Sequence, residues 1–193
     1  MKPDALIVID VQKGLDDPLH GRRSTPDFES NLGRLLGAWR ASGSPVFHVR
    51  HCSVEDKSLL RPELPGNEFK DVAMPMPGEM VIRKSTASAF VSTTLNEALK
   101  DAGVKSLAIV GLTTDHCVSA STRSASDLGY DVVVVEDATA AHEKEAWNGK
   151  SYPAENVHIY SLVALDGEFC EVCSTDVLIA RISNASKPVE SGC

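Results

Sequence analysis

The chain has 193 residues, a formal net charge of −8, 42% hydrophobic residues and 24% charged residues. These proportions are typical of an ordinary globular protein, and we expect a single domain over residues 1–193. The acidic balance argues against nucleic acid and anionic membranes as partners, because both bind a basic face. No run approaches the ~20 apolar residues of a membrane span, and the short apolar run near the start is not typical of a signal peptide. We therefore expect a cytoplasmic protein.

Apolar runs alternate with helical patterns along the chain. Strands are predicted at 5–9, 46–50, 80–83, 106–110 and 131–135, with a short last strand from residue 172. Helices are predicted at 28–41, 93–102, 116–128, 155–165 and 175–182. The stretch 52–78 contains four prolines and is expected to run irregularly over the surface. Such alternation predicts a three-layer α/β/α sandwich of the Rossmann type around a mainly parallel sheet.

Cysteine usage indicates reduced thiols. The count is odd, and the chain is too long to need disulfide bridges. The five residues are Cys52, Cys117, Cys170, Cys173 and Cys193.

Three polar residues follow predicted strands at their carboxyl ends, where ligands bind in parallel sheets. Asp10 follows the first strand, Lys84 the third, and Cys117 lies in the first helical turn after the fourth. That position favours a thiolate and predicts a thiol pKa below the ordinary value of about 8.5. A partly desolvated Asp10 can take the thiol proton, and the Lys84 ammonium can hold Asp10 ionised. Taken singly, each residue has a commoner role as a core thiol, a loop-closing carboxylate or a surface lysine.

The stretches ALIVIDVQ, VIRKSTASAF and VGLTTDHCVSASTRSASDLGYDVVVVEDATAA, which contain these residues, together resemble the isochorismatase-like cysteine hydrolases. The late segment LDGEF is similar to the same family, so that the resemblance covers most of the chain. It implies that Asp10 is the base, Lys84 its electrostatic partner and Cys117 the nucleophile. It also implies a cis peptide bond before Thr113, whose N–H would form an oxyanion hole with the N–H of Cys117.

Metal binding is the main question at the second strand. Zinc-dependent members of the superfamily use an Asp-x-His pair, whereas the comparable stretch here has only His48 and His51. These two histidines are three residues apart and would face opposite sides of a strand. We expect no metal and no cofactor. The alternative is a zinc site built from His51, Cys52 and a loop carboxylate.

Other reactive residues have weaker patterns. Cys170 and Cys173 form a C-x-x-C without the strand-to-helix context of a redox motif, and we expect ordinary thiols. The side chain of His116 should point about 100° away from that of Cys117, which favours a structural or interface role. Asp115 is expected to cap the helix or orient a neighbour.

The predicted function is metal-independent hydrolysis of the C–N bond of a small amide through a thioester intermediate. Gln12, Phe90 and Trp147 are the candidate substrate contacts. One alternative is the vinyl-ether hydrolysis that gives the family its name, and another is a catalytically silent, partner-binding protein on the same fold. Apolar residues within 52–78 exceed what a solvated loop needs, so we also expect a homo-oligomer.

Overall fold

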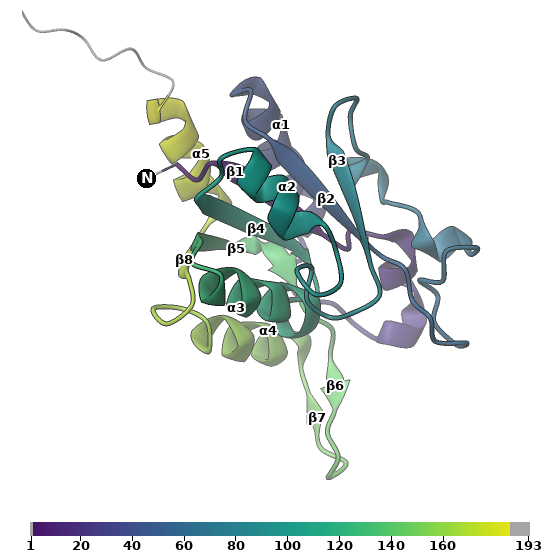
Figure 1. Ribbon diagram of the computed structural model, residues 1–193. Helices are drawn as coiled ribbons and strands as arrows, with labels where there is room; N and C mark the ends of the chain where they lie inside the picture. The colour runs from purple at the N-terminus through teal and green to yellow at the C-terminus, as the bar shows by residue number, and fades with distance from the viewer. Residues whose placement is uncertain (1, 186–193) are drawn as a thin grey trace, which may run out of the picture.

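The computed structural model describes residues 2–185 and is built on a six-stranded sheet (Figure 1). The strand order is β3-β2-β1-β4-β5-β8, and every neighbouring pair is parallel. The strands are β1 (Ala5–Ile9), β2 (Val46–His51), β3 (Met80–Lys84), β4 (Ser106–Leu112), β5 (Asp131–Ala140) and β8 (Glu171–Cys173). The predicted parallel sheet is confirmed.

Five α-helices cover the two faces of this sheet. They are α1 (Phe28–Ala41), α2 (Leu95–Asp101), α3 (Ser119–Asp127), α4 (Ala154–Val163) and α5 (Thr175–Ala185). Buried side chains of α1 and α5 pack in one core, and those of α2, α3 and α4 pack in the other. The expected three-layer sandwich is therefore confirmed. No helix within residues 2–185 has the length and apolar character needed to cross a membrane.

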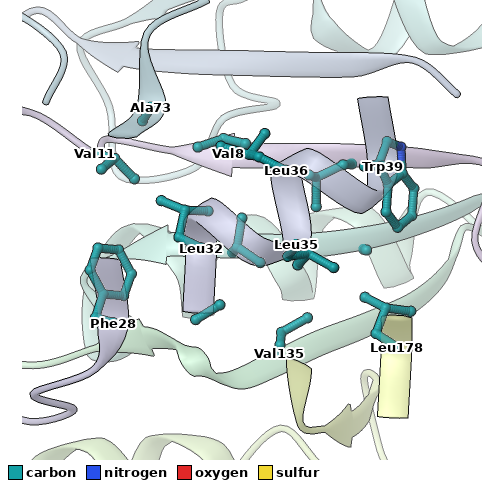
Figure 2. Close-up of a cluster of buried hydrophobic side chains, with 14 of the residues drawn as sticks. Val8, Val11, Phe28, Leu32, Leu35, Leu36, Trp39, Ala73, Val135 and Leu178 are labelled. Carbon is teal, nitrogen blue, oxygen red and sulfur yellow. The ribbon is translucent and has the colours of Figure 1, made fainter. Parts of the chain in front are cut away.

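Strand β1 lies in the middle of the sheet and is buried on both sides. Leu6 and Val8 face the core under α1, while Ile7 and Ile9 face the opposite core. Figure 2 shows Val8 in the first core with Leu36 and other side chains of α1. Because alternate residues of a strand point to opposite faces, only a wholly apolar run can occupy this position. The site that follows β1 is therefore attached to a rigid part of the molecule.

Two regions differ from the sequence prediction. β5 continues to Ala140, beyond the predicted end at residue 135, because its pairing with β4 shifts after Ile109 and resumes at Gly111. The polar residues of the intervening stretch had broken the apolar pattern. Beyond β5, the strands β6 (Lys144–Glu145) and β7 (Ser151–Tyr152) form an antiparallel hairpin that projects from the body of the protein (Figure 1).

The excursion 52–78 is irregular, as predicted, but it is anchored to the body. Two single-turn helices interrupt it, at Pro65–Asn67 and Asp71–Ala73. Phe69 is 2% exposed and forms an isolated bridge with Gln12. Part of the apolar content that suggested an oligomer is therefore used within the chain.

Candidate active site

The structure brings Asp10, Lys84 and Cys117 into contact at the carboxyl edge of the sheet. The ammonium nitrogen of Lys84 lies 2.6 Å from Oδ2 of Asp10 and 3.2 Å from Sγ of Cys117. The side chains of Lys84 and Asp10 are 0% and 2% exposed. One buried cation therefore contacts both a carboxylate and a thiol.

The backbone at the ends of β1 and β4 sets the position of Asp10. Its φ is 50°, a left-handed conformation that aspartate tolerates better than most residues, and its N–H donates to the carbonyl of Val49 at 2.9 Å. Gly111, in the adjacent strand, has a φ of 118°. A Cβ atom there would lie 2.0 Å from the carbonyl oxygen of Ile9, so only glycine allows β4 to pass this close to β1.

Cys117 lies in a tight turn between β4 and α3 (residues 113–118), which we call the nucleophile turn after the role that the family resemblance implies for Cys117. The peptide bond that leads into this turn, between Leu112 and Thr113, is cis. The cis bond implied by the family resemblance is therefore confirmed. Residues Thr114–Val118 form a π-helical turn, where a regular helix start was predicted. The Thr113 carbonyl accepts hydrogen bonds from the N–H groups of His116 at 3.1 Å and Val118 at 3.2 Å. These bonds close the turn around the thiol.

His51 is a fourth member of the site that sequence reasoning did not assign to the triad. Its Nδ1 lies 3.1 Å from the Lys84 ammonium, which also donates to the carbonyl of Thr86 at 3.1 Å. Burial lowers the pKa of His51, and the Lys84 charge lowers it further. A neutral ring has a free nitrogen lone pair that can accept from Lys84. His51 ends β2, which lies between β1 and β3, so the strand-end rule applied to β2 would have found it.

The expected lowering of the pKa of Cys117 is wrong. Burial raises the pKa of Cys117 to about 12, and the charge of Asp10 acts in the same direction against that of Lys84. Burial also raises the pKa of Asp10, although Lys84 opposes the effect. The favourable helix start is outweighed because the sulfur is desolvated and faces a carboxylate.

Asp10, His51 and Cys117 have donor atoms within 4.8 Å of one another, a set that could in principle hold a metal ion. The Lys84 ammonium already contacts all three, at 2.6, 3.1 and 3.2 Å. A second cation at that point would be repelled by Lys84, so these residues do not fit a metal. In residues 2–185, Cys52 belongs to no such group of donors, and the alternative zinc site has no support.

The three candidate substrate contacts lie in different places. Gln12 is fully buried, and its amide makes three hydrogen bonds, two of them to the backbone of His51. Gln12 therefore fixes the backbone of His51 and is not exposed to a substrate. Phe90 is partly buried, with its ring 6.0 Å from that of Tyr130. Trp147 is 97% exposed between β6 and β7, in the projecting hairpin (Figure 1).

The remaining candidates have structural contacts. Asp115 forms an ion pair with Lys144 and lies 3.4 Å from the ring of His116, whose side chain is 65% exposed. Asp115 therefore contacts the neighbouring side chains of His116 and Lys144, in line with one of the two roles predicted for it. Cys170 and Cys173 are unpaired, as are the other cysteines of the described chain, so the expectation of free thiols is confirmed there. Cys193 lies outside the described residues.

Comparison with known proteins gives consistent matches over nearly the whole chain. An isochorismatase domain model matches residues 4–176. The isochorismatase family protein YrdC of Bacillus subtilis is 39% identical over 175 residues, which are 91% of this chain and 94% of YrdC. The ureidoacrylate amidohydrolase RutB of an Enterobacter species is 30% identical over 151 residues, which are 73% of this chain and 64% of RutB.

Solved structures agree with these matches. An isochorismatase family protein from Chromobacterium violaceum has a TM-score of 0.90 at 43% identity, and the match covers 95% of this chain and 94% of the Chromobacterium chain. N-carbamoylsarcosine amidase from Thermoplasma acidophilum has a TM-score of 0.71 at 26% identity, with 91% and 98% covered.

Proposed function

The chain belongs to the isochorismatase family of hydrolases, and we propose that within this family it cleaves the C–N bond of a small amide with Cys117 as the nucleophile. One observation carries the proposal: the buried Lys84 ammonium contacts the Asp10 carboxylate at 2.6 Å and the Cys117 sulfur at 3.2 Å. A catalytically silent binding protein has no physical need for this arrangement. Two of the relatives, RutB and the Thermoplasma protein, are an amidohydrolase and an amidase by name.

The first step is proton transfer coupled to nucleophilic attack. With a thiol pKa of about 12, Cys117 attacks only as its proton leaves, and the adjacent Asp10 carboxylate receives it. The sulfur bonds to the amide carbon, and the carbonyl electron pair moves to oxygen. Lys84 keeps its charge throughout and stays in contact with both partners.

The developing oxyanion needs donors on the far side of the carbonyl. In our proposal these donors are the N–H groups of Thr113 and Cys117. Removing one such donor typically costs 10²–10³ in rate, or about 3–4 kcal/mol. Collapse of the tetrahedral intermediate breaks the C–N bond, and the amine leaves with the proton held by Asp10. Water then attacks the thioester, and Asp10 accepts a proton from it. The C–S bond breaks, the acid product leaves, and Asp10 passes the proton to sulfur to restore the Cys117 thiol.

Space for a substrate adjoins this turn. A cavity of about 450 Å³ is lined by Thr113 together with His20, His142 and Lys144. Its volume is in the range of small-molecule sites. The cavity meets the nucleophile turn at Thr113, Asp115 and His116, and its lining does not include Asp10, Lys84 or Cys117.

Asp10 supports vinyl-ether hydrolysis as a second candidate. Burial raises the pKa of this carboxyl group. A protonated carboxyl group can transfer its proton to the carbon of an enol ether. That chemistry makes no covalent bond to sulfur. Cys117 would then contribute only to the shape of the site.

A panel of small amides, assayed for ammonia or amine release, tests the proposal. Cys117→Ala should abolish turnover while the protein stays folded, and intact-mass spectrometry should show an acylated Cys117 in the wild type. Cys170→Ala is the matched control, because burial raises the pKa of Cys170 to about 12 as well. Full amidase activity in Cys117→Ala would overturn the proposal. Turnover of isochorismate that survives Cys117→Ala but not Asp10→Asn would support the second candidate.

A further inference from the structure

A partly buried side-chain hydrogen bond connects the nucleophile turn to helix α4. Oγ1 of Thr114 lies 2.8 Å from Nδ1 of His158, and Thr114 is fully buried. Thr114 directly follows Thr113 and lies three residues before Cys117, so it is fixed between the two proposed oxyanion donors. His158 is in the middle of α4, far from the triad in sequence.

The direction of this hydrogen bond follows from the surroundings of His158. Burial lowers the pKa of the ring, so near neutral pH it is neutral and carries one N–H. The backbone carbonyl of Glu136, which raises this pKa, can only accept that N–H. With Nδ1 occupied by Thr114, the ring donates from Nε2 to Glu136 and accepts from the Thr114 hydroxyl.

The Glu136 carbonyl lies in the irregular part of β5, where the pairing with β4 is interrupted. Pairing between β4 and β5 stops at Val134 and resumes at Thr139, so Glu136 lies in the shifted stretch between them. Its carbonyl also accepts from the hydroxyl of Thr139 at 3.0 Å. His158 therefore connects the irregular part of β5 to the nucleophile turn.

The turn has a second side-chain contact, an ion pair whose Lys144 partner is exposed to solvent. Burial by itself would raise the pKa of Asp115, but the pairing with Lys144 and a hydrogen bond from Thr113 help to lower it. The Lys144 side chain is 36% exposed. Water and salt weaken such an ion pair more than the partly buried hydrogen bond to His158, whose Thr114 side is fully buried.

We propose that His158 is a positioning residue, which acts through Thr114 to fix the direction of the Thr113 and Cys117 N–H groups. The inference rests on the proposed acyl-transfer function. Oxyanion donors work only within about 2.7–3.1 Å of the oxyanion, and a displacement of about 1 Å can cost roughly 10² in rate. Loss of the Thr114 hydroxyl or of the ring frees the middle of the turn, while Asp10, Lys84 and the thiol keep their contacts.

The test uses p-nitrophenyl acetate as the acyl donor, because its reaction with a thiol passes through the same kind of tetrahedral oxyanion. Thr114→Val and His158→Ala should lower kcat by about tenfold or more, with KM nearly unchanged. Thr114→Ser keeps the hydroxyl and should retain most activity. His158→Asn places an amide oxygen near the position of Nδ1 and should restore part of the loss. The double variant should be no slower than the slower single variant.

Alkylation of Cys117 by iodoacetamide separates positioning from damage to the thiol. This reaction forms no oxyanion, so its rate should be the same in wild type, Thr114→Val and His158→Asn. The control on α4 is Ser161→Ala, since among residues 2–185 the Ser161 hydroxyl bonds only to the Val157 carbonyl of its own helix, at 2.8 Å.

Wild-type kcat in Thr114→Val, or parallel losses in alkylation and acyl transfer, would overturn the inference. If His158→Ala does not fold, the comparison of Thr114→Val with Thr114→Ser decides the question alone. Failure of the proposed function has a different signature, because wild type and Cys117→Ser would then release p-nitrophenolate at equal rates.

Discussion

Substitution of Lys84 by methionine should destabilise the protein in a pH-dependent way. The ammonium contacts Asp10 at 2.6 Å, Cys117 at 3.2 Å and His51 at 3.1 Å, and its side chain is fully buried. Removing one partner of a buried ion pair leaves the other charge uncompensated, which costs about 3–5 kcal/mol. A loss of that size is a large part of the ~5–15 kcal/mol by which a domain is stable. Urea unfolding of Lys84→Met against wild type measures it.

The sign of the pH dependence follows from Asp10. Burial already raises its pKa in the folded state, and without the opposing Lys84 charge that pKa rises further. In the unfolded chain the same carboxyl has a pKa of about 3.9. Between these two values the folded state binds a proton that the unfolded state lacks, so the free energy of unfolding falls as pH rises. The deficit of Lys84→Met should be greatest above the folded pKa and should shrink as pH is lowered.

Two further variants isolate the cause. Asp10→Asn combined with Lys84→Met removes both charges and should recover most of the stability while activity remains lost. Lys84→Arg keeps the charge but changes its shape and reach, so only partial rescue of kcat is expected. Lys13→Met is the control: it breaks a pair with Glu68 that is also 2.6 Å long but about half exposed, and stability should change little. A Lys84→Met protein as stable as wild type at every pH would refute the reasoning.

Four other outcomes are expected. The pH profile of kcat should have an acid limb at a pH above the ordinary aspartate value of 3.8, because Asp10 must be ionised and its pKa is raised. Chelation with EDTA should leave the rate unchanged, and activity lost on chelation and restored by zinc would contradict the site as described. Gly111→Ala should prevent soluble expression, since its Cβ would lie 2.0 Å from the Ile9 carbonyl oxygen. The control is Gly37→Ala, whose Cβ would meet nothing within 4 Å; its free energy of unfolding should equal that of wild type or exceed it by up to about 1 kcal/mol. Light scattering should give a mass that is a multiple of the chain mass; a monomer at micromolar concentration would contradict the proposed homo-oligomer.

Much of the fold could be predicted from apolar runs alone. Strand β1 (Ala5–Ile9) is apolar at every position and buried at every position, because it is covered on both faces. The rule that ligands bind at the carboxyl ends of parallel strands then placed Asp10, Lys84 and Cys117 together. No pattern in the sequence marked the hairpin of β6 and β7, whose short strands pair only with each other and carry no buried apolar face.

The links around the nucleophile turn also lay beyond sequence reasoning. His158 contacts Thr114 across 44 positions of sequence, and neither residue forms a motif with the other. The sequence pattern around His51 indicates only a metal ligand, because a histidine next to a cysteine is typical of a zinc site and not of a partner for lysine. Such contacts depend on the register of the sheet and on how α4 lies across it, which a local pattern does not determine.

The protonation state of the thiol shows most clearly how the parts of the site depend on one another. Taken alone, Cys117 at a helix start with Lys84 nearby predicts a thiolate. The structure adds Asp10 within the same buried space, and one cation cannot stabilise two anions there. The pKa of Cys117 is therefore raised to about 12, and that of Asp10 is raised as well, although the Lys84 charge opposes both shifts. In the proposed mechanism, nucleophilic attack moves the proton from sulfur to carboxylate without changing the net charge of the group, and this is how a largely buried site would activate a thiol whose pKa is high.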